Sequence, residues 1–78
     1  MKTSFKITSP YGEFRGVLDE ELLNEEVEWQ VIESYCNLFN LSVQKATRKE
    51  REGVAVWKVV AFDRDTSQVY EVRAEFNY

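Results

Sequence analysis

Residues 19–40 constrain the fold of this 78-residue chain more than any other segment, because they alone have a helical composition. The segment contains neither Gly nor Pro, has few β-branched residues and is rich in Glu and Leu, all of which favour helix. Asp19 can cap its start, and Asn24, which precedes Glu25 and Glu26, is a second possible start. Asn40 is tolerated in the left-handed conformation that ends helices. The sequence therefore predicts one helix ending at Asn40, with its first residue left open.

This helix has an apolar side and a polar side when successive residues are placed about 100° apart. The polar stripe holds Glu26, Gln30, Glu33 and Asn37, and we expect it to face solvent. The broad apolar arc consists of Val27, Val31, Ile32, Tyr35, Cys36, Leu38 and Phe39. An arc of this kind has to be buried against another layer of structure.

The segments at residues 3–8 and 68–76 alternate between apolar and polar residues, as half-buried strands do. Before the helix, strands over residues 3–8 and 13–18 are joined by a Ser-Pro-Tyr-Gly turn, because Pro presets the turn backbone and Gly tolerates positive φ. After the helix, a third strand begins at Leu41, a fourth covers residues 54–62 and a fifth covers residues 68–76. Charged turns are expected at residues 48–53 and 63–67.

Together these elements predict a single α+β domain over residues 1–78, in the order β-β-α-β-β-β, with the helix packed on an antiparallel sheet. In strand 68–76 the residues Tyr70, Val72, Ala74 and Phe76 share a dry face. Strand 54–62 is apolar on both faces, so we expect a central strand with both faces at least partly covered.

Composition limits where the chain works and what it can do. Cys36 is the single cysteine, so no internal disulfide can form, and no apolar run approaches the length of a signal peptide core or a membrane span. We therefore expect a cytoplasmic protein without a membrane partner. The chain has no His, and its three Gly residues are scattered, which leaves no support for catalytic, metal or cofactor sites. Cys36 itself is expected to be a small buried hydrophobe.

Charge is the feature that favours a binding function. Residues 19–40 carry seven acidic side chains and no Lys or Arg. Acids near a helix start are common, and a solvated helix face explains part of this run. Like charges on one element repel, however, so the surplus favours a protein partner with a basic surface. The expected contacts are Glu25, Glu26, Glu28 and Glu33, with Trp29 as an aromatic anchor or a core residue.

In size, charge and lack of an active site the chain resembles small acidic phage-encoded inhibitors, among them anti-restriction and anti-CRISPR proteins. That resemblance involves no shared motif and rests on general properties only. It implies a viral inhibitor whose acidic helix acts as a nucleic-acid mimic and blocks a basic nucleic-acid-binding host protein.

Two alternatives remain open. A single-stranded nucleic acid can be held by Lys45, Arg48, Lys49 and Arg51 in the basic 45–51 turn, while Tyr70 or Trp57 stacks a base. The net charge of −4, and the interruption of these cations by Glu50 and Glu52, argue against this function. A homodimer through an edge strand, or through the second face of strand 54–62, is compatible with either partner.

Overall fold

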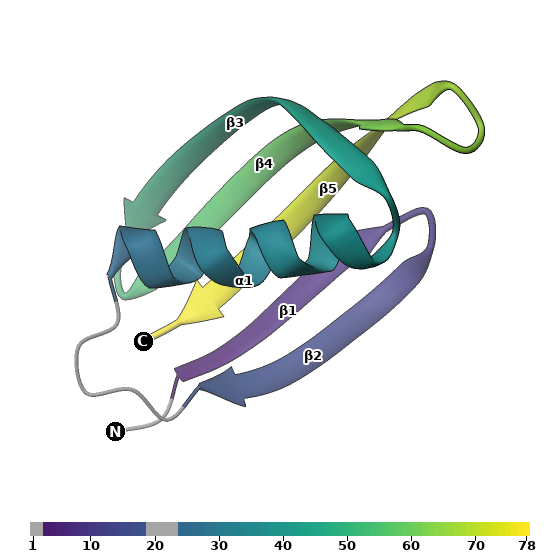
Figure 1. Cartoon of the computed structure of the whole chain (residues 1–78). Coiled ribbons are helices and arrows are strands. Elements are labelled where there is room, and N and C mark those ends of the chain that lie inside the picture. Colours follow the sequence, from purple (N-terminus) through teal and green to yellow (C-terminus); the bar gives the residue numbers. More distant parts are fainter. Residues whose placement is uncertain (1–2, 19–23) are drawn as a thin grey trace.

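The predicted order of elements is confirmed by a computed structural model, which describes residues 3–18 and 24–78 (Figure 1). Its elements are β1 (Thr3–Ser9), β2 (Gly12–Leu18), α1 (Glu25–Leu38), β3 (Leu41–Arg51), β4 (Val54–Asp63) and β5 (Gln68–Asn77). Every neighbouring pair of strands is antiparallel, and the sheet order is β2-β1-β5-β4-β3. The α+β prediction, with one helix on an antiparallel sheet, is therefore correct.

The start of α1 is set by its cap. Asn24 has extended backbone geometry, and its Oδ1 accepts a hydrogen bond from the backbone N–H of Val27 at 3.1 Å. The helix ends at Leu38, and Asn40 follows with a φ of 56°, the left-handed conformation expected of it. The alternative start at Asp19 lies outside the described residues.

The turn between β3 and β4 is much shorter than predicted. The sequence predicted a charged turn over residues 48–53, but β3 continues to Arg51 and only Glu52 and Gly53 connect the strands. Both residues have positive φ, 52° and 79°. Such a two-residue turn matches the twist of paired strands, so β3 and β4 stay paired up to the two residues that flank the turn, Arg51 and Val54. The residues assigned to a basic 45–51 turn therefore lie in a strand.

The core lies between α1 and one face of the sheet. On β4 the buried side chains are those of Ala55, Trp57, Val59 and Ala61, so the face that contains Trp57 is the inner one. On β5, Val72, Ala74 and Phe76 are buried and Tyr70 is half-buried, as the alternation predicted. The helix contributes Ile32, Tyr35 and Cys36.

The opposite face of the sheet, which we call the open face, is not covered by any described element (Figure 1). The apolar side chains of β4 on this face, Val54, Val56, Val60 and Phe62, are half-buried. The sequence predicted partial cover here, and neighbouring side chains can supply it. Val56, for example, lies opposite Lys49 on β3 and Glu75 on β5, whose aliphatic stems can shield apolar surface.

The β2 end of the inner face is less well covered than the apolar arc of the helix predicted. Leu38 belongs to that arc, yet 74% of its surface is exposed, and Phe14 on β2 is 52% exposed. Figure 1 shows β2 at the edge of the sheet, beyond the strands that α1 crosses most closely. Part of the predicted arc therefore remains accessible at this edge.

Candidate binding surfaces

Glu28 is the centre of a buried polar cluster that joins α1 to the sheet. Its side chain is fully buried. Arg48 on β3 donates to both carboxylate oxygens, from Nε at 2.9 Å and from Nη2 at 3.1 Å. The indole Nε1 of Trp57 on β4 donates at 2.7 Å, and the hydroxyl of Tyr78 completes the cluster. Three side chains, from β3, from β4 and from Tyr78, thus converge on the carboxylate that α1 contributes.

This cluster is fully satisfied, which indicates a structural role. Within the described residues no buried side-chain oxygen or nitrogen lacks a hydrogen-bond partner. The hydrogen bond to Glu28, together with the charges of Glu28 and Glu50, raises the pKa of Arg48 above its ordinary value, so the guanidinium stays charged. Each carboxylate oxygen of Glu28 accepts two hydrogen bonds, which uses both of its lone pairs and leaves none for an external partner.

The cluster corrects two predicted contacts. Glu28 was expected to meet a protein partner, but it is buried and neutralised by Arg48. Arg48 was expected to hold a phosphate, but its side chain lies on the inner face, opposite Trp57 in the β3–β4 register, and is committed to Glu28. The burial of Glu28 could have been predicted from helical spacing. Glu28 precedes Ile32 by one turn and Tyr35 by two, and both of these residues are buried.

The other predicted acidic contacts are on the surface. Glu25, Glu26 and Glu33 are exposed and form no ion pair with any residue in 3–18 or 24–78. Gln30 and Asn37 are exposed beside them, which confirms the predicted polar stripe. Trp29 is half-buried, and its ring centroid lies 5.5 Å from that of Trp57, so it packs against the core.

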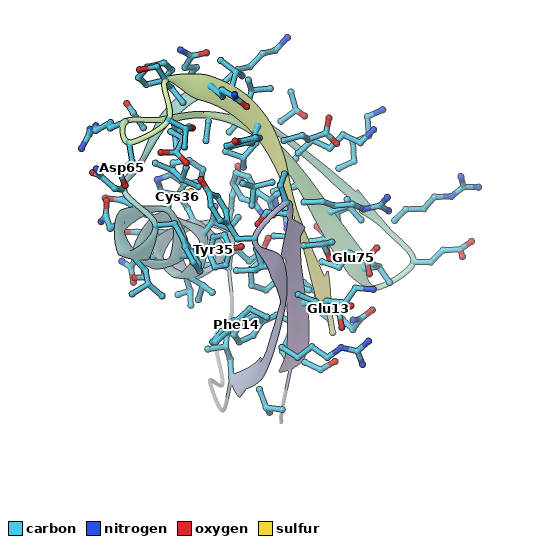
Figure 2. The ribbon with its side chains drawn as sticks, turned by 90° about the vertical axis from the view of Figure 1, so that its right-hand side faces the viewer. Glu13, Phe14, Tyr35, Cys36, Asp65 and Glu75 are labelled. Carbon is cyan, nitrogen blue, oxygen red and sulfur yellow. The ribbon has the colours of Figure 1, made fainter. Side chains whose placement is uncertain are left out.

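The open face of the sheet is basic, although the chain as a whole is acidic. Cross-strand partners share a face, so the register assigns each charged strand residue to one side. Among the described residues, the cationic side chains on the open face are Lys6, Arg15, Lys45, Lys49, Arg51, Lys58 and Arg73. The acidic ones are Glu13, Glu71 and Glu75. Figure 2 shows Glu13 and Glu75 pointing away from the helix, and Phe14 pointing toward it.

The charges on this face are not evenly paired. Glu13 bonds Arg15 at 3.0 Å and lies 3.8 Å from Lys6, while Glu75 pairs with Arg73 at 3.1 Å. The β3 and β4 cations have no ion-pair partner in the described part of the chain; they are Lys45, Lys49, Arg51 and Lys58. We call these four residues the basic cluster. Lys45, Lys49 and Arg51 were predicted contacts, whereas Lys58, which the alternation of β4 places on the same face, was not predicted.

The two aromatic side chains that were predicted to stack a base do not lie on the same face as the basic cluster. Trp57 is buried on the inner face, and Tyr70, opposite Ala61 in the β4–β5 register, lies on that same face. Tyr70 packs edge-on against Tyr11, with ring centroids 5.7 Å apart. Neither predicted stacking residue is therefore near the cations, and the open face of β4 offers only the half-buried Phe62.

Cys36 lies in a buried environment that disfavours its ionised form. Burial, with a smaller contribution from the charge of Glu33, raises the pKa of the Cys36 thiol, so the reactive thiolate is disfavoured. Within residues 3–18 and 24–78 no group of three His, Cys, Asp or Glu side chains is placed to hold a metal ion. No helix in the same ranges is both long and apolar enough to cross a membrane.

Comparisons with known proteins add no relative. No family model matches the chain, and neither the curated proteins nor the solved structures contain a significant match.

Proposed function

We propose that this protein is a non-enzymatic binding module that holds a nucleic-acid strand by its phosphates against the open face of the sheet. The observation that supports this proposal is the basic cluster on β3 and β4, whose four cations have no ion-pair partner among the described residues. Cationic side chains gathered on one surface are the usual footprint of a phosphate-binding protein.

In the folded chain neither Glu50 nor Glu52 separates the cations of the open face. Glu50 interrupts the cations along the chain, but it lies opposite Ala55 on the inner face, where it accepts hydrogen bonds from Arg48. Glu52 lies in the two-residue turn beyond the end of β3. On the open face itself, Lys45, Lys49 and Arg51 follow one another without an intervening acid.

The proposed contacts are to the backbone of the nucleic acid and not to its bases. Alternate residues of a strand repeat about every 6.8 Å, so β3 presents an extended row of cations. On the described part of this face Phe62 is the single aromatic side chain and it is half-buried, so little base stacking is available and binding should depend weakly on sequence. Four phosphate contacts to a single strand predict a slope of about −3 in log affinity against log salt.

A fluorescently labelled single-stranded oligonucleotide, titrated at about 50 mM salt, tests the proposal. We expect binding that weakens with salt along this slope and is lost when Lys49 and Lys58 are both changed to Glu. The control is Arg64→Glu, an exposed charge change in the β4–β5 turn, which should bind as the wild type does. Absence of binding at low salt, or equal loss in the control, would contradict the proposal.

The acidic surface of α1 supports a second candidate function. Glu25, Glu26 and Glu33 are exposed on an element with no basic residue, which suits the basic groove of a nucleic-acid-binding protein. Such a module acts as an inhibitor by mimicking nucleic acid. Glu28 takes no part in this version of the proposal, and Trp29 contributes only its exposed rim.

Affinity capture with the Glu26→Lys, Glu33→Lys double variant separates the two candidates. The acidic-surface proposal predicts that a basic protein is captured by the wild type and lost with this variant. The matched control is Glu71→Lys on the open face, which should retain capture. The basic face alone accounts for function if the double variant still binds the oligonucleotide and captures the same proteins as the wild type.

A further inference from the structure

The two edges of the sheet differ in how well they are protected from pairing with another strand. The β3 edge carries a register shift between Val43 and Lys45, and it is lined by cations, both of which discourage edge pairing. The β2 edge has neither Pro nor Lys within the strand, and its pairing with β1 is regular from end to end. Among the described residues no strand pairs with its outer side. Of the two edges, β2 is therefore the one less protected against pairing with another strand.

An apolar groove lies beside this edge on the inner face. Its volume is about 260 Å³, and its walls come from β1, β2 and the second half of α1. The lining residues are Ile7, Phe14, Val31, Ser34, Tyr35 and Leu38. Phe14 and Leu38 are among the exposed large hydrophobic side chains, although Phe14 also contacts Phe5 and Tyr35. An unpaired strand and an apolar groove thus form one continuous surface.

We propose that this surface binds a second copy of the chain, with β2 of each copy paired antiparallel across a twofold axis at Phe14. A twofold axis between two antiparallel strands is perpendicular to the sheet. Residues that pair across this axis must therefore have their side chains on the same face of the sheet. Only registers centred on a residue satisfy that condition. The choice is therefore limited to a few positions along β2.

Charge selects among these registers. Centring on Phe14 places Glu13 of each copy opposite Arg15 of the other. Centring on Glu13 or on Arg15 instead places two like charges opposite each other, which is destabilising. Centring on Gly16 pairs Arg15 with Val17 and gives neither charge a partner. The strand is therefore self-complementary about Phe14, which argues for a second copy over an unrelated peptide.

The same register also covers apolar surface. The two Phe14 rings meet at the axis, and each extends the groove that Val31 and Leu38 line in the partner copy. Both helices then lie on one side of a continuous sheet and both basic clusters on the other. The dimer does not depend on the proposed nucleic-acid function, but it would present the two clusters on one surface.

Sedimentation of the full chain over a concentration series tests the dimer. We expect the mass to rise from 9.2 kDa toward twice that value as concentration increases. Glu13→Arg or Arg15→Glu alone should weaken the dimer by about tenfold or more, since each creates like-charge contacts at two symmetric places. The double swap restores opposite charges across the axis and should restore dimerisation. Glu71→Arg, an equal charge change on β5, is the control and should dimerise normally.

Hydrogen exchange provides a second measurement that needs no variant. Alternate backbone amides of β2 should become protected as the wild-type concentration increases, while those of the β3 edge should not change. A monomer mass at every concentration would overturn the proposal. So would a dimer that persists in both single variants, or a double swap that dissociates as the single variants do.

Discussion

Removing the guanidinium of Arg48 should destabilise the fold far more than removing any cation of the open face. In Arg48→Met the side chain keeps an unbranched apolar stem, but the buried carboxylate of Glu28 loses its counter-charge. Trp57 and Tyr78 can still donate to it, yet neither carries a positive charge. A carboxylate that is fully buried without a cation is strongly disfavoured.

The expected cost is a large part of the total stability. Breaking a buried ion pair by removing one partner costs about 3–5 kcal/mol. Arg48 keeps 19% of its side chain exposed, so water reaches the pair and the lower end, about 3 kcal/mol, applies. A chain of this length has a stability of roughly 4–12 kcal/mol. With a urea dependence of about 1 kcal/mol per M, the unfolding midpoint should fall by about 3 M.

Urea unfolding followed by tryptophan fluorescence measures this loss, because Trp57 lies inside the cluster and Trp29 packs against it. The control is Lys49→Met, the neighbouring residue on the opposite face, which should change stability by less than about 0.5 kcal/mol. The Glu28→Met, Arg48→Met double variant should recover about 1–2 kcal/mol, because no unpaired charge remains. It should not recover fully, since the indole N–H of Trp57 loses its acceptor.

Two results would refute this reasoning. If Arg48→Met costs less than about 1 kcal/mol, Glu28 does not depend on its counter-charge. If the double variant is no more stable than Arg48→Met alone, the loss comes from the missing side chain and not from an unpaired carboxylate.

Three further predictions follow from local contacts. Cys36 should resist thiol reagents in the folded protein and react at the rate of an exposed thiol in urea; rapid labelling without denaturant would contradict its burial. Gly16→Ala should destabilise the fold by about 1–3 kcal/mol in the same urea assay, because an added Cβ would collide with the ring of Phe5, whereas Gly12→Ala meets no neighbour and is strained only by its φ of 120°. The hydrogen bond from Arg15 lowers the pKa of Glu13, so the hairpin should gain stability from this pair above the ordinary carboxyl pKa and lose it as pH falls through the lowered value. Carboxyl NMR titration should show that midpoint rising toward normal in Arg15→Gln; an unchanged midpoint would exclude the contact.

The order of elements was predictable because each segment has a distinct hydrophobic period. Residues after Asn24 repeat with the spacing of a helix, most of the remaining segments alternate, and strand 54–62 is apolar on both faces. The Asn24 cap and the left-handed Asn40 follow from local chemistry, which the sequence contains in full. The order of strands in space was not predicted, since β1 pairs with β5 across most of the chain length.

Glu28 was assigned to the surface because of its residue type, although its spacing from Ile32 placed it on the buried side of α1. A buried carboxylate is acceptable only with a partner, and that partner comes from β3, twenty residues away in sequence. The register that brings Arg48 to Glu28 depends on the whole sheet. The position of Glu28 was therefore available from the sequence, but the reason it is tolerated was not.

Charge along the chain and charge on the surface are different quantities in a β protein, and the proposed nucleic-acid partner rests on this difference. Counted by segment, residues 45–51 are a mixed run in which Glu50 weakens four cations. In a strand, however, neighbours in sequence point to opposite faces, so Arg48 and Glu50 belong to the inner side while Lys45, Lys49 and Arg51 belong to the open side. The mistaken six-residue turn concealed this separation, because a turn has no alternating faces. Once β3 is extended to Arg51, the period of two alone separates the charges, and an acidic chain acquires a basic face.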